Sequence, residues 1–426
     1  MNISNIHQLF LESSGICTDT RKIVKNNLFF ALKGANFNGN EYAEEAIKQG
    51  ASYAIIDDKQ YHTSDQFIVV NDVLETLQHL ATYHRNYLAI PIIALTGSNG
   101  KTTTKELINC VLSAQFNTTA TSGNLNNHIG VPLTLLSMDK NTEIGIVEMG
   151  ANHIKEIAFL CNIAQPDFGY ITNIGKAHLE GFGGIEGVLK GKTELYQHLR
   201  EKDKLVFLNS EDPKLLKASS GMNTYTFSQQ GSSNARIQLQ NADPMVSVAY
   251  KNLEIQSNLI GVYNFTNIAA AIAIGSYFKV HEKLIKTAIE SYIPSNNRSQ
   301  IIAKNDFTII MDAYNANPSS MNAAIDNLKQ LESYPKTVFL GDMFELGKTA
   351  EEEHQKIADK ASSSSFDVIF LIGENFYQVS TTDPRVKKYR SFEDLQQNET
   401  FEKLQGTVLI KGSRGMKLER VLDILH

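Results

Sequence analysis

Short, continuous apolar runs recur along the central part of the chain, and segments with helical spacing separate them. The runs lie at residues 92–95, 144–150, 168–173 and 205–209. Continuous apolar runs between helices are typical of strands that are buried on both faces of a parallel sheet. We therefore predict a parallel α/β domain here, with ligand-binding groups at the carboxyl ends of its strands.

The same alternation continues on both sides of this domain. Residues 1–88 mix short strand-like and helical segments, which predicts a small α/β domain. Four further apolar runs predict a C-terminal Rossmann-like three-layer sandwich, and they lie at residues 307–311, 338–340, 368–372 and 408–410. This part lacks GxGxxG, so a dinucleotide is not indicated. A more polar interval, from about residue 225 to residue 260, predicts an antiparallel elaboration of the central domain.

Length and composition narrow this interpretation. The 426 residues exceed one compact core, so we expect three domains at residues 1–88, 89–296 and 297–426. The formal net charge of -6 gives no overall positive field, and we expect no nucleic-acid partner. Three widely spaced cysteines do not suggest disulfides or a zinc cluster. No basic leader and no run of about 18 apolar residues occurs, so we expect a cytoplasmic protein without membrane insertion.

A candidate phosphate-binding loop joins the first central strand to a helix. It reads Gly97-Ser98-Asn99-Gly100-Lys101-Thr102-Thr103. The glycines let backbone N–H groups point at an anion, the lysine adds a positive charge, and the first threonine offers a hydroxyl to magnesium. This GxxGKT motif is shorter than the Walker pattern GxxxxGK[ST]. Strand, loop and helix nevertheless occur in the required order, which favours nucleotide binding over an ordinary turn with a surface lysine.

Three side chains after the central strands are candidates for metal binding or catalysis. Glu148 ends the strand beside the one that feeds the loop, where a carboxylate could hold magnesium; the alternative is a solvated glutamate. His178 lies in a glycine-rich segment after the next strand, and ligand and structural roles are equally open. Nothing local distinguishes Lys192 from Lys190, and by itself it is interpreted as a solvated helix lysine.

The N-terminal domain contains one loop that could suit a polar ligand. Residues 33–40, KGANFNGN, follow a strand that we expect to be buried. They can offer backbone N–H groups, amide side chains and an aromatic face. On local chemistry alone, a plain turn between a strand and a helix is the favoured interpretation.

A series of motifs, in the same order along nearly the whole chain, resembles the Mur ligase family. They are TGSNGKTTTKE (96–106), NLNNHIGVPLTLL (124–136), EMGANHIKEI (148–157), TNIGKAHLEGFGG (172–184), GVYNFTNIAAA (261–271), DAYNANPSSM (312–321), LGDMFELG (340–347) and IKGSRGMKLE (410–419). The resemblance implies ATP-driven amide synthesis in the cytoplasmic assembly of peptidoglycan. Within the family, NANPSSM, GDMFELG and the N-terminal segments resemble the branch that joins D-alanyl-D-alanine to UDP-MurNAc-tripeptide.

The resemblance also implies a mechanism and its cofactors. The tripeptide carboxylate attacks the γ-phosphate of ATP, and the amine of D-alanyl-D-alanine attacks the resulting acyl phosphate. Thr102 and Glu148 hold one magnesium ion, His178 binds a second, and Lys192 is carbamylated. A carbamate replaces a positive charge with a negative one, which suits the side chain to a metal. We expect a monomer whose domains close around the substrates.

Further site residues follow from the same resemblance. The backbone of residues 97–103 and Lys101 bind the ATP phosphates. Residues that match the family's nucleotide contacts, from the adenine side and from the hinge and C-terminal domain, are Asn264, Asn267, Arg298 and Asp312. Tyr314, Asn315 and Arg414 lie on strand ends expected to face the dipeptide and the acyl phosphate, with Asn315 as a catalytic candidate. Thr20, Arg21, Lys33, Asn36, Phe37 and Asn38 match the region that receives the uridine diphosphate.

Some interpretations remain open. Many relatives have GxHN where this chain has Gly261-Val262-Tyr263-Asn264, so a histidine role there cannot be carried over. The nearest alternative function is a sister ligase that adds a single amino acid to the same precursor, or a folate polyglutamylating enzyme. An alternative from another class is a P-loop protein that binds nucleotide and partners without forming a bond.

Overall fold

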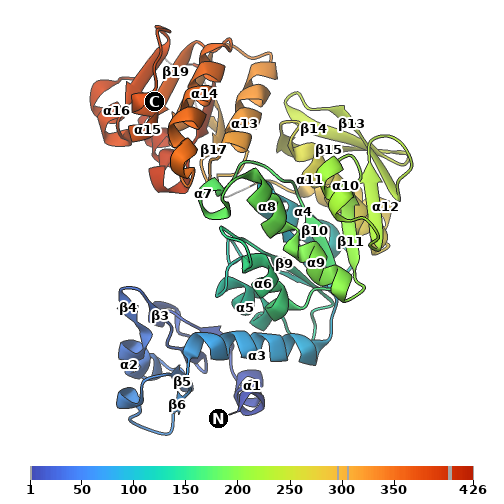
Figure 1. The fold of residues 1–426 in the computed structure, drawn as a ribbon, viewed down its shortest axis with the longest axis vertical. Coiled ribbons are helices and arrows are strands. Elements are labelled where there is room, and N and C mark those ends of the chain that lie inside the picture. Colours follow the sequence, from blue (N-terminus) through green and yellow to red (C-terminus); the bar gives the residue numbers. More distant parts are fainter. Residues whose placement is uncertain (1, 295–296, 305–306, 402–404, 426) are drawn as a thin grey trace.

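The computed structural model of the protein describes residues 2–294, 297–304, 307–401 and 405–425. Three α/β domains follow one another along its long axis, with the N-terminal and C-terminal domains at opposite ends (Figure 1). The predicted fold class is confirmed. The expected domain boundaries stay predictions, and residue 296, next to the second boundary, lies outside the described residues.

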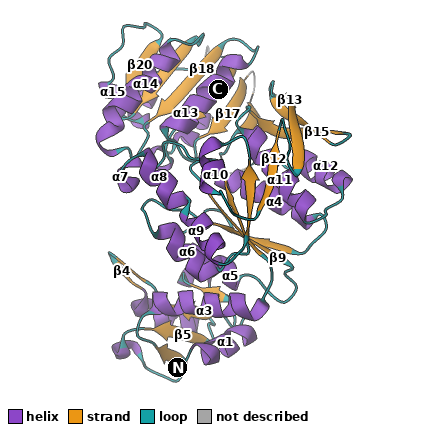
Figure 2. Cartoon of the chain, turned by 45° about the vertical axis from the view of Figure 1, so that its right-hand side comes forward, coloured by secondary structure: helices purple, strands orange, loops and turns teal. Residues whose placement is uncertain are grey.

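A four-stranded parallel sheet, in the order β1-β2-β5-β6, forms the N-terminal domain. Its elements are α1 (Ile3–Glu12), β1 (Ile16–Cys17), β2 (Leu28–Phe30), β3 (Lys33–Gly34), β4 (Phe37–Asn38), α2 (Ala43–Lys48), β5 (Tyr53–Ile56) and β6 (Phe67–Val69). Helix α3 (Val73–Leu88) begins after Asp72, whose side chain accepts a hydrogen bond from the Glu75 N–H. This helix lies between the N-terminal sheet and the middle domain (Figure 2).

The middle domain contains a nine-stranded sheet in the order β15-β14-β13-β12-β11-β10-β7-β9-β8. Its strands are β7 (Ile92–Thr96), β8 (Thr118–Ala120), β9 (Ile144–Glu148), β10 (Phe168–Ile171), β11 (Leu205–Asn209), β12 (Thr224–Ser228), β13 (Ala235–Asn241), β14 (Met245–Tyr250) and β15 (Leu253–Ile260). Its helices are α4 (Lys101–Ser113), α5 (Gly130–Leu136), α6 (Glu156–Ala164), α7 (Leu179–Phe182), α8 (Ile185–Lys192), α9 (Glu194–Glu201), α10 (Pro213–Ala218), α11 (Asn264–Tyr277) and α12 (Glu282–Ser291).

The predicted antiparallel elaboration is correct for β13, β14 and β15 but wrong for β12. Strand β12 runs parallel to both β11 and β13. Its sequence, TYTFS, alternates polar and aromatic residues, and the strand is half-buried over its first three residues and buried over its last two. Such alternation is typical of antiparallel strands with one solvated face, and here it occurs on a half-covered parallel strand.

The C-terminal domain contains a six-stranded sheet in the order β16-β17-β21-β18-β19-β20, and among its described residues only β16 is antiparallel. Its strands are β16 (Gln300–Lys304), β17 (Phe307–Asp312), β18 (Lys336–Gly341), β19 (Val368–Ile372), β20 (Val386–Tyr389) and β21 (Gly406–Lys411). Its helices are α13 (Pro318–Gln330), α14 (Ala350–Ser362), α15 (Glu374–Gln378), α16 (Phe392–Asn398) and α17 (Val421–Ile424). Alternate residues of β18 enter two different apolar clusters, which makes this domain a three-layer sandwich.

The N-terminal and middle domains are joined by one continuous cluster of buried apolar side chains, which we call the shared core. It contains Leu28 and Leu77 of the first domain together with Val131 and Ile157 of the second. The C-terminal clusters consist mainly of that domain's own residues, joined from the middle domain by Ile260 and a few partly buried side chains. No helix in the described part of the chain is long and apolar enough to cross a membrane.

Candidate active site

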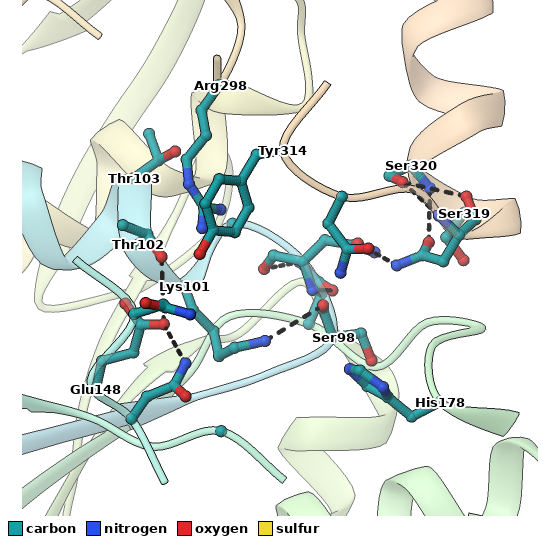
Figure 3. Close-up of a pocket in the computed structure, with 18 of the residues that line it drawn as sticks. Ser98, Lys101, Thr102, Thr103, Glu148, His178, Arg298, Tyr314, Ser319 and Ser320 are labelled. Atoms are coloured by element: carbon teal, nitrogen blue, oxygen red, sulfur yellow. Dashed lines mark hydrogen bonds between the residues drawn. The ribbon is translucent and has the colours of Figure 1, made fainter. Parts of the chain in front are cut away.

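A cavity of about 620 Å³ lies where the carboxyl ends of the middle-domain strands face the C-terminal domain (Figure 3). Both domains contribute to its lining, and polar side chains predominate there. Because open α/β sheets bind ligands at this edge, the cavity is the candidate active site.

The phosphate-binding loop forms one side of the cavity. Gly97 has a φ of 146° and lies so close to Thr172 that a Cβ would fall 1.9 Å from the threonine Oγ1. Only glycine fits there, and the loop then leads directly into α4. Lys101 Nζ donates a hydrogen bond of 2.7 Å to the Gly97 carbonyl. Burial lowers the pKa of Lys101, and the Glu148 charge offsets part of this effect. The loop therefore surrounds a confined ammonium group that a phosphate can pair with.

Glu148 lies beside this loop and is almost completely buried. Its Oε1 accepts hydrogen bonds from Thr102 Oγ1 at 3.2 Å and from Asn126 Nδ2 at 2.8 Å. Its Oε2 is buried and has no hydrogen-bond partner among the described residues. An unpaired carboxylate oxygen next to a hydroxyl fits a hard cation such as Mg²⁺, which prefers oxygen ligands.

His178 lines the same cavity from the residue that precedes α7. Its Nδ1 pairs with a carboxylate oxygen of Glu345 from the C-terminal domain. Within the described residues, no group of three or more His, Cys, Asp and Glu side chains could hold a metal by itself. A second magnesium ion at His178 stays a prediction, and it would need ligands from the substrates.

Lys192 is not a solvated lysine, so the interpretation from local sequence is wrong. Its side chain is 1% exposed, and its Nζ donates a hydrogen bond of 3.0 Å to the Ala151 carbonyl. The ammonium also lies 5.1 Å from the centre of the Phe182 ring. Burial lowers the pKa of Lys192 well below its usual value, and the nearby Lys101 charge adds to this effect. Lys190 on the same helix is exposed, so the fold distinguishes the two lysines.

The residues predicted to bind the nucleotide side of ATP also line the cavity. Asn267 accepts a hydrogen bond of 3.0 Å from Thr104 Oγ1 and donates one of 2.8 Å to Asn264. Arg298 stacks on the ring of Tyr314 at 3.6 Å. Asp312 accepts a hydrogen bond of 2.5 Å from Lys411 Nζ. All of these side chains except Thr104 line the cavity, as do Tyr263 and Asn315.

Arg414, which was predicted to face the dipeptide, does not line this cavity. Its guanidinium is more than half exposed and pairs with Glu419 at 2.9 Å, and it lies 6.0 Å from the Tyr314 ring centre. It is not among the cavity-lining residues.

The N-terminal candidates lie at a second, separate cavity of about 460 Å³ around the β3–β4 hairpin. Lys33, Asn36, Phe37 and Asn38 line it, together with neighbouring residues of the same stretch. Phe37 stacks on Tyr42 with ring centres 5.1 Å apart. The structure therefore places a ligand-sized hollow at the stretch whose local chemistry favours a plain turn.

Thr20 and Arg21 do not line either cavity. They belong to a short 3-10 turn, in which Arg21 pairs with Asp19 at 2.8 Å. The hydrogen bond from Arg21 lowers the pKa of Asp19 to about 2. The Arg21 side chain is 87% exposed, so the pair contributes little to stability.

Several polar residues that line the cavity were missed, among them Asn126, Asn173, Asn317 and Lys411. Asn317 caps α13 and donates a hydrogen bond of 2.7 Å from its Nδ2 to Asn99 Oδ1 in the phosphate loop. The backbone N–H of Asn99 in turn donates to Asn173 Oδ1 at 3.1 Å. Each of these four residues lies inside one of the quoted motif segments, which was the available signal.

A phosphate loop on a parallel sheet, a buried carboxylate beside it and a Rossmann-like domain across the cavity define a multidomain P-loop nucleotide-binding enzyme. Three family profiles match this chain: "Mur ligase family, catalytic domain" at residues 12–91, "Mur ligase middle domain" at 95–275, and "Mur ligase, glutamate ligase domain" at 297–414. The chain belongs to the Mur ligase family, and it is an ATP-dependent ligase, as predicted.

Similar proteins cover the chain almost completely. It is 35% identical to the UDP-N-acetylmuramoyl-tripeptide--D-alanyl-D-alanine ligase of Bacillus subtilis (strain 168), over 96% of this chain and 93% of that protein. The crystal structure of MurF from Acinetobacter baumannii gives a TM-score of 0.83 at 28% identity, over 98% of this chain and 97% of the other. MurF ligase from Thermotoga maritima in complex with ADP also gives 0.83, at 26% identity and the same coverage.

Proposed function

We propose that this protein joins D-alanyl-D-alanine to UDP-N-acetylmuramoyl-tripeptide at the expense of ATP, in the cytoplasm and as a monomer. One observation carries the proposal: a single cavity unites the phosphate loop with Asn317 and its neighbours from the C-terminal domain. An acyl-phosphate ligase needs this arrangement, because the phosphate donor and the attacking amine must both reach the same carboxyl group, the first at its oxygen and the second at its carbon. The B. subtilis relative, similar along nearly its whole length, carries this activity in its name.

The chemistry would proceed in two steps. A carboxylate is a poor acyl donor, so a carboxylate oxygen of the tripeptide first attacks the γ-phosphorus of ATP, and the bond to ADP breaks. The amine of D-alanyl-D-alanine then attacks the acyl carbon, loses a proton and expels inorganic phosphate. Lys101 and the loop N–H groups would orient the phosphates, while the closed domains would exclude water from the acyl phosphate.

A bound magnesium ion and a modified lysine also belong to the proposal. Thr102 and Glu148 would hold a magnesium ion, which neutralises phosphate charge when bound; the unpaired Glu148 Oε2 supports this. Lys192 would be carbamylated by addition of its neutral amine to carbon dioxide with loss of a proton. The lowered pKa of this buried amine supports that reaction, since only the neutral form is nucleophilic.

The substrates would be distributed over the three domains. Asn264, Asn267, Arg298 and Asp312 would bind the nucleoside part of ATP, and Tyr314 and Asn315 would face the dipeptide. The hairpin cavity would take the uridine diphosphate, with Phe37 as a stacking surface. The two cavities share no lining residue, so an extended substrate would have to span both.

Phosphate release with each substrate omitted in turn tests this function. We expect release only when ATP, UDP-MurNAc-tripeptide and D-alanyl-D-alanine are all present, and mass spectrometry should detect the pentapeptide product. Release supported by a single amino acid instead of the dipeptide would indicate a sister ligase. ATP turnover that does not respond to either cosubstrate would refute ligation and favour a nucleotide-binding protein that forms no bond.

A further inference from the structure

Helix α7 of the middle domain lies beside the C-terminal domain (Figure 1), and the loop after β18, residues 342–347, contacts it: the Glu180 N–H donates to the Glu345 carbonyl at 3.4 Å. Leu179 of α7 packs against an apolar cluster of the C-terminal domain. Gly347 has a φ of 55°, and a Cβ there would meet the Glu180 Cβ at 3.1 Å. The two backbones therefore approach closely, and side chains on either side are brought into contact.

His178 and Glu345 meet at this point of approach. The carboxylate of Glu345 pairs with His178 Nδ1. Both residues have left-handed backbone, with φ values of 51° and 61°, which residues other than glycine rarely adopt. Such backbone persists only where the surroundings hold it, and it often marks a functional position.

The loop that carries Glu345 is held rigidly by its own domain. The Met343 N–H donates a hydrogen bond of 2.9 Å to His354 Nε2, and the Phe344 N–H donates one of 3.0 Å to Ser413 Oγ. The imidazole of His354 is completely buried, and its Nδ1 donates to the Ala350 carbonyl at 2.6 Å. The carboxylate is therefore presented from a preorganised support.

We infer that Glu345 is a positioning residue for His178. By accepting the Nδ1–H, it selects one neutral form of the imidazole and leaves Nε2 as the nitrogen available to a ligand in the cavity. Because the two residues belong to different domains, His178 reaches this state only when the C-terminal domain docks. This inference deepens the proposed function, since it assigns the docking loop a task at the same site.

Nitrogen-15 NMR shows which ring nitrogen of His178 carries the hydrogen, and it tests this inference without relying on activity. The full-length protein with labelled histidine should be examined at pH 8.5, where an ordinary histidine is neutral. We expect the Nδ1–H form in the wild type and a mixture of both neutral forms in Glu345→Ala. Gly347→Ala, which keeps the carboxylate but crowds the docked loop, should shift the equilibrium in the same direction. Glu352→Ala removes an exposed carboxylate that pairs with Lys356 of its own helix, and it should resemble the wild type.

Kinetics provide the second readout. For Glu345→Ala we expect kcat to fall about 10–100-fold, the usual cost of losing a partner that orients a ligand, with a smaller change in the KM for ATP. In a His178→Ala background the same substitution should add nothing. An unchanged Nδ1–H form in Glu345→Ala, or equal effects in both backgrounds, would overturn the inference. The proposed function fails separately, through the substrate-omission assay on the wild type.

Discussion

The N-terminal and middle domains share an extensive apolar core, whereas the C-terminal domain meets the middle domain through polar pairs and only a few apolar side chains. Helix α3 contributes Leu77 to the shared core. Across the other contact, Lys176 Nζ pairs with Glu353 at 2.6 Å, and Asn317 donates to Asn99. Apolar burial is worth far more than a partly exposed ion pair. The contact between the N-terminal and middle domains is therefore suited to a fixed arrangement, which we call the fused contact. The contact between the middle and C-terminal domains is suited to repeated opening and closing around substrates.

The largest expected effect concerns the middle domain, which takes part in both contacts. We expect Lys192→Ala to lower turnover at least about 100-fold, as for other lost electrostatic groups, and small carboxylates to restore part of it. Lys192 touches neither neighbouring domain in the contacts described above, so X-ray scattering with and without ligands should match the wild type. Lys190→Ala, on the same helix but exposed, is the control. A fully active Lys192→Ala variant would remove this residue from the site.

Stability measurements compare the two domain contacts directly. Leu77→Ala should lower the free energy of unfolding by about 2–5 kcal/mol, because it leaves a cavity in the shared core. Lys176→Ala on the other contact should cost less, because its side chain is 45% exposed and Lys356 remains 3.6 Å from the Glu353 carboxylate. Urea unfolding, monitored by hydrogen exchange, measures the loss of stability in both variants. Equal costs for the two substitutions would contradict the distinction between a fused and a reversible contact.

The smallest expected effect is a pH dependence of the fused contact. His7 Nε2 and His84 Nδ1 lie 3.0 Å apart, and His84 Nε2 lies 2.9 Å from the Met138 carbonyl of the middle domain. Burial lowers the pKa of both imidazoles, and the charge of His84 lowers that of His7 further. The unfolded chain therefore takes up protons first as the pH falls below about 6.5, so stability should decrease from there downward until the folded pKa values are passed.

Urea unfolding at several pH values measures this decrease. The double variant His7→Gln/His84→Gln keeps hydrogen-bonding side chains but cannot titrate, so its stability should fall less steeply in the same range. Parallel curves for the wild type and the double variant would assign the pH dependence to other histidines.

Much of the fold could be predicted because its signals are local. The continuous apolar runs at β7, β9 and β10 are the central strands, and the glycine loop lies where GxxGKT indicates. Helix α6 begins at Glu156, inside the motif at residues 148–157. The Glu156 side chain accepts hydrogen bonds from the Asn152 and His153 N–H groups and holds them in a turn. The edge strands β16 and β20 were not predicted, because short, half-exposed strands lack a clear apolar run.

The site was less predictable because its contacts join residues far apart in the sequence. The burial of Lys192 depends on how α8 packs, and no local pattern distinguishes it from Lys190. The pairs His178–Glu345 and Asn99–Asn317 each connect two domains. The motifs indicated which segments form the site, but only the assembled fold determines which side chains contact each other.

The place of β21 in the C-terminal sheet has a consequence for synthesis on the ribosome. This strand lies between β17 and β18, yet it follows every other strand of that sheet in the chain. During translation the two halves of the sheet remain unjoined until β21 has emerged. The shared core uses segments made much earlier, so the first two domains can fold while the third is still being translated. The nascent enzyme would thus complete its phosphate loop well before the surface that closes over it.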